Sequence, residues 1–379
     1  MFQIAVENSF DFRSPEFAAF YAGSAATAFQ HPVWLAALYE MLLVHNRAEP
    51  LIIVARETDG RLAMVLPLLR RRYALLRAVE FADLRVSDYV SPVAEAGAFA
   101  RLLADPAARR DIGRALRPYD LLRIGKIADQ SLAIEMLLKA GGRRDMGSSA
   151  YATRLDGSFD AWRALRLAPS YRKELDKKRR QLNRRGNVRF GVMEGPQAIR
   201  SAFEALREYR RLRFGSSELL QVSAYFDFYL GIATDGAGDL ARTYTLTVDE
   251  RPVAVILGLK RKDAFLVILS GFDHSGFKNQ SIGSLTFEDV ARDCIARGEN
   301  MLDFTIGDEP YKLTFGSERQ PMFEVSRAGS PLGLAAGVMI DRLPAAKSMA
   351  RRLFHPGRKV TGPANDQPLG AVGDEPTAP

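Results

Sequence analysis

Cysteine, histidine and long apolar runs are scarce in this sequence, and each scarcity excludes a class of protein. The single cysteine, Cys294, cannot form an internal disulfide, which fits a reducing cytoplasm. The four histidines are scattered, so no metal-ligand spacing is present and we expect no metal. No apolar run approaches the ~20 residues that cross a bilayer. The first residues lack the pattern of a secretory signal, so we expect a cytoplasmic protein, at most peripheral to the inner membrane face.

Positive charge is concentrated in one segment of an otherwise balanced chain. The net charge of the 379 residues is +8, and hydrophobic (47%) and charged (26%) contents are those of a globular protein. Between Arg166 and Arg189 there are seven Arg and three Lys against Glu174 and Asp176. This segment predicts either a solvated basic helix or a surface for an anionic partner, such as a nucleotide-sugar, an anionic glycan, acidic lipid headgroups or RNA. Aromatic residues for base stacking are absent after Tyr171, which makes nucleic acid the weaker choice.

An order of elements repeats along the chain. Two stretches, residues 51–71 and 243–261, alternate apolar residues on both sides of a short turn and predict β-hairpins. Each is preceded by a helical pattern and followed by a third strand, a helix and a fourth strand. The expected elements are residues 32–43, 51–71, 74–81, 107–116 and 120–124 in the first half, and residues 198–214, 243–261, 264–272, 284–297 and 301–305 in the second. The sequence thus predicts a duplicated α+β fold.

Composition suggests four parts in this chain. We expect an N-terminal half over residues 1–150 and a C-terminal half over residues 151–330. Residues 331–356 read as a basic helical extension. Residues 357–379 hold four Gly and four Pro with almost no large apolar groups, and we expect them to be disordered.

The run from Phe265 to Gly316 has the features of a site. It reads as a buried strand, a polar loop with glycine, an amphipathic helix, a second buried strand and a short Gly/Asp/Tyr/Lys segment. A glycine loop at the start of a helix can hold a phosphate through backbone N–H groups. The two strands can carry side chains to the same edge of the sheet.

The order of these motifs resembles that of FemAB-like tandem-GNAT acyltransferases associated with bacterial cellulose or exopolysaccharide synthesis. The motifs that carry the resemblance lie at residues 29–40, 66–71, 87–89, 171–182, 271–283 and 302–316. The resemblance implies two GNAT-like halves, each a mixed, mainly antiparallel sheet flanked by helices. It also implies acyl-CoA as co-substrate, bound by the second half.

The donor loop is predicted at residues 278–284. The usual GNAT pattern, Gln/Arg-x-x-Gly-x-Gly/Ala, reads here as residues 280–285, with Leu285 where a small residue is usual. The candidate donor-binding residues are Lys278, Gln280, Ser281, Ile282, Gly283 and Ser284. A plain strand-to-helix loop with a serine N-cap is the competing interpretation. Acyl-CoA is the favoured donor, and an acyl carrier or an aminoacyl-tRNA remains open.

Four residues are candidates for catalysis. Asp303 lies in an apolar strand, where burying a carboxylate is costly unless it is paired or takes part in catalysis. The competing interpretation is an aspartate that faces solvent at the end of the strand. His274 is a possible general base in a loop where histidines are usually just exposed. The resemblance places Tyr311 and Lys312 at the active site, where Tyr would protonate the leaving thiolate and Lys would stabilise an oxyanion or a phosphate.

Five further residues are candidates for acceptor binding. The resemblance places Asp88 and Tyr89 of the first half at the cleft between the halves. Asp273 ends the strand that enters the donor loop, and Arg172 and Lys173 begin the basic helix.

We therefore expect a cytoplasmic acyltransferase that moves an acyl group, with acetyl favoured, from a CoA thioester to an amine or hydroxyl acceptor. The resemblance implies a role in exopolysaccharide or cell-envelope synthesis with a glycan, lipid-linked or small-molecule acceptor. Two other functions stay open: a non-catalytic membrane-surface module of a polysaccharide synthase, and an aminoacyl-tRNA-dependent transferase. RNA binding is a further and weaker alternative.

Overall fold

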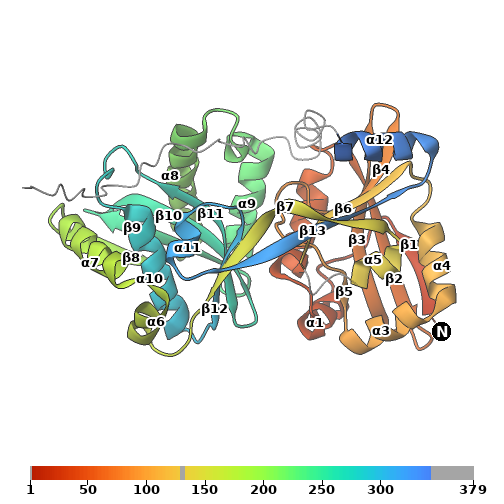
Figure 1. Ribbon diagram of the computed structural model, residues 1–379, viewed down its shortest axis with the longest axis horizontal. Coiled ribbons are helices and arrows are strands. Elements are labelled where there is room, and N and C mark those ends of the chain that lie inside the picture. The colour runs from red at the N-terminus through yellow and green to blue at the C-terminus, as the bar shows by residue number, and fades with distance from the viewer. Residues whose placement is uncertain (1, 129–132, 343–379) are drawn as a thin grey trace, which may run out of the picture.

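The computed structural model describes residues 2–128 and 133–342, which form two α+β lobes side by side (Figure 1). The predicted tail at 357–379 and most of the predicted extension at 331–356 lie outside the described residues. The beginning of that extension is a helix, α12 (Pro331–Arg342).

The first lobe contains one strand, a helical segment, a run of antiparallel strands, further helices and two more strands. Its elements are β1 (Phe2–Glu7), α1 (Pro15–Gly23), η1 (Ala28–Gln30), α2 (Pro32–Ala37), η2 (Leu38–Leu42), β2 (Ala48–Glu57), β3 (Leu62–Tyr73), β4 (Leu76–Phe81), β5 (Val93–Ala94), α3 (Ala96–Ala104), α4 (Pro106–Ala115), β6 (Leu121–Ala128), α5 (Ala133–Leu138) and β7 (Gly141–Arg154).

The second lobe repeats this order after two helices, α6 and α7. Its elements are α6 (Phe159–Arg166), α7 (Pro169–Asn183), β8 (Val188–Val192), α8 (Pro196–Phe214), η4 (Leu219–Gln221), α9 (Ser223–Asp235), β9 (Ala241–Val248), β10 (Arg251–Arg261), β11 (Ala264–Phe272), α10 (Ile282–Ala296), β12 (Met301–Ile306), α11 (Tyr311–Thr314) and β13 (Glu318–Ala328).

The predicted hairpins form for local reasons. Gly60, with φ +89°, makes the turn between β2 and β3, a conformation that glycine adopts without strain. The β9–β10 turn is the two-residue turn Asp249-Glu250, with φ +48° and +65°. Two positive φ values are the signature of the tight turn whose twist matches a hairpin.

The two lobes exchange their last strands. All described strands join in one 13-stranded sheet, whose central order is β6-β13-β7-β12. The last strand of the second lobe, β13, therefore lies beside β6, and the last strand of the first lobe, β7, lies beside β12 (Figure 1). In the described part of the sheet, the β4–β6 and β11–β12 pairs are parallel and the other pairs are antiparallel. The predicted α+β fold with a mixed, mainly antiparallel sheet is confirmed.

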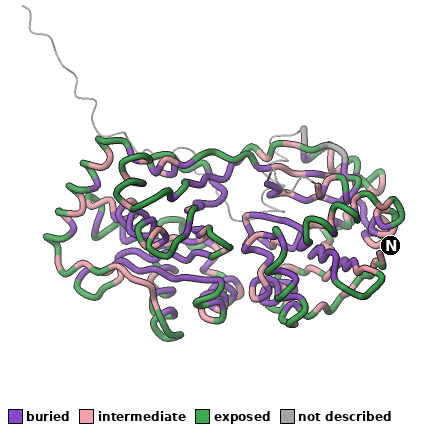
Figure 2. Tube along the Cα trace, turned by 90° about the horizontal axis from the view of Figure 1, so that it is seen from below, coloured by how far each residue is buried: buried purple, intermediate pink, exposed green. Residues whose placement is uncertain are grey.

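Buried residues follow the strands of both lobes, and the outer helices alternate between buried and exposed positions (Figure 2). One apolar cluster belongs to both lobes, because the ring of Trp34 on α2 packs edge-on against Phe228 on α9, with centroids 5.1 Å apart. The predicted domain boundary at residue 150 falls inside β7, a strand that pairs with β12. The two halves are thus joined by sheet and by core.

Candidate active site

The strands β11 and β12 form a fork in the second lobe. Their parallel pairing runs through three residue pairs and ends at Leu266 and Asp303, although both strands continue. Thr305 then adopts φ +55°, and the register of β12 with β7 shifts between Asp303 and Ile306. Such an irregularity turns side chains and backbone groups out of the ladder. The fork therefore begins at Asp303.

Asp303 lies buried at this fork in contact with the other lobe. The Tyr89 hydroxyl donates to the carboxylate, with 2.9 Å to each oxygen, and the Thr305 amide donates to Oδ1 at 2.7 Å. Burial raises the pKa of Asp303 to about 6, although the Thr305 amide, the Tyr89 hydroxyl and the charge of Lys312 act in the opposite direction. A carboxylate with a pKa near neutrality can accept a proton and return it. The solvent-facing interpretation of Asp303 does not hold.

Tyr89 is held in place by the first lobe. It follows β4 in a loop where Gln30 donates to its carbonyl at 3.2 Å and Phe29 packs edge-on against its ring. Burial raises the pKa of the Tyr89 phenol well above its usual value, so it remains a donor. Its neighbour Asp88 is half-buried, and the charge of Asp88 acts to raise the pKa of both Asp303 and Tyr89.

Lys312 is buried beneath the fork. Its ammonium donates to the carbonyls of Thr305 at 3.2 Å and Gly307 at 2.9 Å, and it pairs with Glu309 at 3.0 Å. These three partners match the three donors of an ammonium. Lys312 thus holds the irregular end of β12 and supplies positive charge near Asp303.

Tyr311 lies in an aromatic cluster next to Lys312. Its ring stacks on Phe287 at 5.2 Å with an angle of 3°, and it meets Phe304 edge-on. Burial raises the pKa of the Tyr311 phenol, so this group keeps its proton at neutral pH. The phenol thus carries a proton that it could donate, although the raised pKa makes it a weaker acid than an ordinary tyrosine.

Asp273 serves the loop that leaves β11. It is buried, and it accepts hydrogen bonds from the Gly276 amide at 2.9 Å and the Ser275 hydroxyl at 2.8 Å, with Arg251 at 2.6 Å. Burial acts to raise the pKa of Asp273, but these hydrogen bonds and the Arg251 charge together lower it below its usual value. Among the described residues, the side-chain contacts of Asp273 thus belong to the turn and to the start of β10, with none to the Asp303 cluster.

His274 is exposed next to this turn, with its ring edge-on to Phe272. We expect His274→Ala to change the rate of acyl transfer by no more than about threefold, because exposed substitutions away from a site have small effects. The comparison is made in one transfer assay with the wild-type protein. A loss of two orders of magnitude would instead make His274 the general base.

The predicted donor loop leads into α10. Ser281, with φ +50°, precedes the helix, and the first-turn amides of Ile282, Gly283 and Ser284 have no acceptor within the helix. Lys278 is exposed and Gln280 is half-buried. Lys178 of α7 donates to the Asn279 carbonyl at 2.7 Å, which brings a positive charge to the loop. Positive charge and open amides favour an anion here.

Leu285 does not add bulk to this loop. Its side chain is fully buried in the apolar core of the second lobe, and its carbonyl accepts a hydrogen bond from Arg179. The departure from the usual GNAT pattern is therefore accommodated inside the helix packing.

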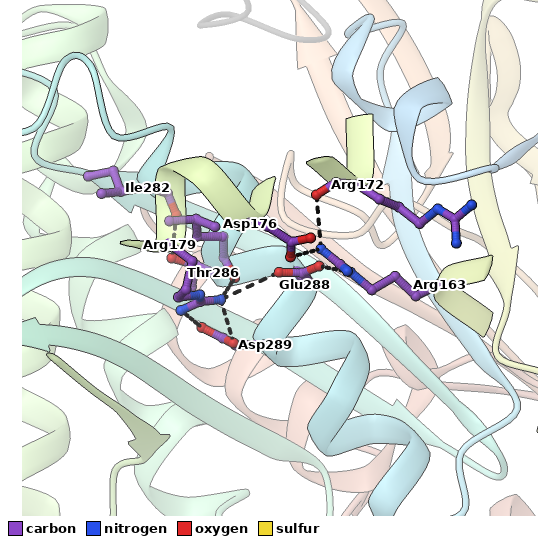
Figure 3. Close-up of polar contacts among 9 residues, drawn as sticks. Arg163, Arg172, Asp176, Arg179, Ile282, Thr286, Glu288 and Asp289 are labelled. Atoms are coloured by element: carbon purple, nitrogen blue, oxygen red, sulfur yellow. Dashed lines mark hydrogen bonds and ion pairs between the residues drawn. The ribbon is translucent and has the colours of Figure 1, made fainter. Parts of the chain in front are cut away.

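The positive charge of the basic helix α7 is partly neutralised by buried carboxylates of α10. Arg179 bonds both oxygens of Asp289 at 2.7 and 2.8 Å, and Arg163 bonds Glu288 at 2.6 Å (Figure 3). Both carboxylates are buried on α10. The arginines of this network therefore fasten α7 and α6 to the donor helix.

The two substrate candidates on α7 lie apart from the Asp303 cluster. Lys173 is exposed, and the Arg172 guanidinium points away from the ion-pair network while its carbonyl accepts from Arg163 (Figure 3). The structure records no contact between either residue and the Asp303 cluster.

Thr305 is the residue of this cluster that sequence reasoning missed. Its amide bonds Asp303, and its hydroxyl donates to the Val267 carbonyl on β11 at 3.1 Å, across the fork. An aspartate two residues before such an amide is a common turn pattern, and this signal was available in the sequence.

The corresponding fork in the first lobe is filled by charged side chains. The β4–β6 pairing ends at Glu80 and Arg123, where Glu80 accepts from Tyr73 and Arg123 bonds Glu324 of β13. Burial raises the pKa of Glu80 to about 7. Strand β4 leads from this pairing into the loop that contains Tyr89, so the first lobe supplies a residue to the fork of the second.

The second-lobe site lies in a stretch that is similar to a known domain family. Residues 169–313 match the model of the acetyltransferase (GNAT) domain, a stretch that contains the fork, the donor loop and Asp303. The second half of the chain is therefore similar to a GNAT acetyltransferase domain. GNAT domains normally bind acyl-CoA, and the described residues contain no group of ligands that could hold a metal. Comparison with curated protein sequences gave no match.

Solved structures share the fold over nearly the whole chain. FemX superimposes with a TM-score of 0.59 at 12% identity, covering 84% of this chain and 96% of its own. L-PGS from Bacillus licheniformis gives a TM-score of 0.54 at 12% identity, with 92% of this chain and 100% of its own covered. The C-terminal domain of a putative lysylphosphatidylglycerol synthetase from Agrobacterium fabrum gives 0.52 at 13% identity, with 85% and 94% covered. At such identities these likenesses show the fold alone.

Proposed function

We propose that the fork between β11 and β12 transfers an acyl group from a CoA thioester to an amine or hydroxyl acceptor, with Asp303 as general base. The observation that carries the proposal is the buried Asp303 carboxylate, with a pKa of about 6, at the start of the fork. The α10 N-terminus, at the other end of β11, supplies open amides for the donor phosphates.

The donor, when bound, supplies the acyl group as a thioester. The acceptor nitrogen or oxygen forms a bond to the acyl carbon, and the carbon–sulfur bond breaks. Asp303 takes the proton that the acceptor loses, and Tyr89 holds the carboxylate toward the fork. Tyr311 keeps its proton at neutral pH and would give it to the departing sulfur. Positioning and charge stabilisation then supply most of the rate enhancement.

The donor site makes a direct prediction. Ser281→Asp places a carboxylate beside the first-turn amides, where it repels phosphates and interacts favourably with the helix. We expect it to weaken acetyl-CoA binding at least about tenfold without loss of thermal stability. Ser281→Asn, which has the same shape without the charge, should stay within about threefold. Isothermal titration calorimetry with acetyl-CoA measures both.

Equal acetyl-CoA affinity in the wild type and in Ser281→Asp would show that the donor phosphates do not bind at the N-terminus of α10. No heat of binding to the wild-type protein with acetyl-CoA or longer acyl-CoAs would remove the CoA-dependent proposal. The aminoacyl-tRNA alternative would then be tested with charged tRNA, whose binding must weaken steeply with salt. The link to exopolysaccharide or cellulose synthesis rests on the sequence resemblance alone and stays a prediction.

A further inference from the structure

The helix α12 has an unusual composition. Residues 331–340, PLGLAAGVMI, contain no polar side chain. A soluble helix normally keeps a polar face toward water. An apolar helix on the outside of a protein therefore needs a partner that covers it.

Small residues and one isoleucine fasten α12 to the first lobe. A Cβ atom on Gly333 would lie 1.6 Å from the Asp120 carbonyl oxygen, so only glycine fits this contact. Gly337 faces Leu121, and Ile340 is buried with Leu121 against the rim formed by Tyr73 and Leu76. This face of the helix is fixed against the sheet.

The opposite face points outward with its large apolar side chains exposed. Their exposed fractions are 47% for Leu332, 61% for Leu334, 41% for Val338 and 53% for Met339. Leu75, in the adjacent β3–β4 turn, is 87% exposed. Figure 1 shows α12 along the upper edge of the first lobe, beside β4.

Positive charge borders this apolar face. Arg72 is exposed next to the β3–β4 turn, and Arg117 is exposed near Tyr119, whose backbone closely approaches Gly329 before α12. The chain that continues from α12 is basic as well. Helix α12 ends in Asp341 and Arg342, and between residues 343 and 359 the chain has five Lys and Arg and no acidic residue.

We propose that the outer face of α12, together with Leu75, docks the protein on an anionic lipid bilayer. Exposed apolar side chains with a cationic border are the features of a helix that lies in the membrane interface. In the described residues no helix is long and apolar enough to cross a membrane, so the contact is peripheral. A two-fold contact between copies would bring the basic borders of the two copies together, and like charges would repel. The basic C-terminal segment would meet the same repulsion if it covered this face.

The test compares two triple variants with the same change of charge. Leu334→Glu/Val338→Glu/Met339→Glu alters the proposed face, and Val44→Glu/Leu165→Glu/Leu212→Glu alters exposed apolar residues elsewhere. In co-sedimentation with phosphatidylcholine vesicles containing phosphatidylglycerol, we expect the first variant to lose at least about tenfold in partitioning, and the control to change little. Binding should weaken with salt and with vesicles of phosphatidylcholine alone.

A second measurement guards against a folding defect. Cys294 is fully buried, so a cysteine introduced at position 334 can be labelled alone with a polarity-sensitive fluorophore. We expect its emission to shift to the blue only when anionic vesicles are added, while a label at position 165 stays unchanged. Equal partitioning of the two triple variants would overturn the proposal. The proposal would also be overturned if the label at position 334 were already shielded from water without lipid. Loss of this shielding on truncation after residue 342 would assign the cover to the C-terminal segment, and its loss on dilution would assign it to a second copy.

Discussion

Asp303→Asn is expected to lower the rate of acyl transfer by roughly 10²–10⁴-fold, the usual contribution of a general base. Asparagine keeps the size of the side chain and an oxygen for the Thr305 amide, but it cannot take a proton. Acetyl-CoA affinity should remain, because the proposed phosphate contacts lie on α10. The measurement is thiol release from acetyl-CoA in the presence of a panel of amines, with calorimetry for donor binding.

The pH dependence of the same reaction identifies the group. Asp303 must be ionised to act as base, so the wild-type rate should fall below a midpoint near pH 6. Tyr89 stabilises the ionised form, so Tyr89→Phe should move this midpoint upward while the plateau rate changes less. If Tyr89→Phe leaves the midpoint unchanged, Tyr89 does not stabilise the ionised form of the general base.

The stability of Asp303→Asn distinguishes lost chemistry from lost folding. The folded-state pKa, about 6, exceeds the ordinary value of 3.8, so the folded protein holds this proton more tightly than the unfolded chain. The protonated form thus favours folding below pH 4, and this contribution disappears as pH rises through 6. At pH 7 the ionised group costs about 2–3 kcal/mol, since one pKa unit is about 1.4 kcal/mol. Asp303→Asn should therefore be more stable than the wild type at pH 7 and equal to it below pH 4. An inactive variant that is also less stable at pH 7 would contradict this account.

The same carboxylate shows how far sequence reasoning reaches. An acidic residue in an apolar strand is visible in the sequence, and so are the two hairpins, since a two-residue turn between alternating strands is a local signal. Local signals also place the helix that follows the donor loop. What they predict is the order of elements and a short set of candidates.

Contacts between distant segments are what the sequence could not supply. Tyr89 and Asp303 are 214 residues apart, and they meet because the lobes exchange β7 and β13. The predicted boundary at residue 150 lies among glycines and serines, yet residues 141–154 form a strand whose register the other lobe provides. Lys312 likewise follows a turn that suggests exposure, and only the irregular end of β12 explains its burial. Each of these outcomes depends on partners that no local pattern encodes.

Arg179→Met is expected to destabilise the protein by roughly 3–5 kcal/mol, because it leaves the buried Asp289 carboxylate without its ion-pair partner. Asp289 would lose both of its bonds to Arg179, and Glu288 would lose a charge 3.6 Å away while keeping Arg163 (Figure 3). Chemical denaturation at pH 7 measures the loss. Arg180→Met is the matched control, since this exposed neighbour on the same helix carries the same charge, and we expect a change within about 0.5 kcal/mol.

The pH dependence of this loss has a definite sign. Burial already raises the pKa of Asp289 above its ordinary value, although Arg179 acts to lower it. Without Arg179 the folded-state pKa rises further, so the ionised carboxylate opposes folding above that pKa and ceases to do so once protonated. The deficit of Arg179→Met should therefore be largest at neutral pH and shrink as the solution becomes acidic. A deficit that is the same at all pH values would point to lost packing of the arginine stem instead.

The double variant Arg179→Met/Asp289→Leu separates the charge from the contact. Replacing both partners by apolar groups removes the unpaired carboxylate, so we expect most of the stability lost in the single variant to return. Acetyl-CoA affinity should return with it, because α7 also brings Lys178 to the carbonyl of Asn279 in the donor loop. Recovered stability without recovered affinity would mean that the arginine–carboxylate network aligns the donor loop through its geometry as well as fastening the two helices.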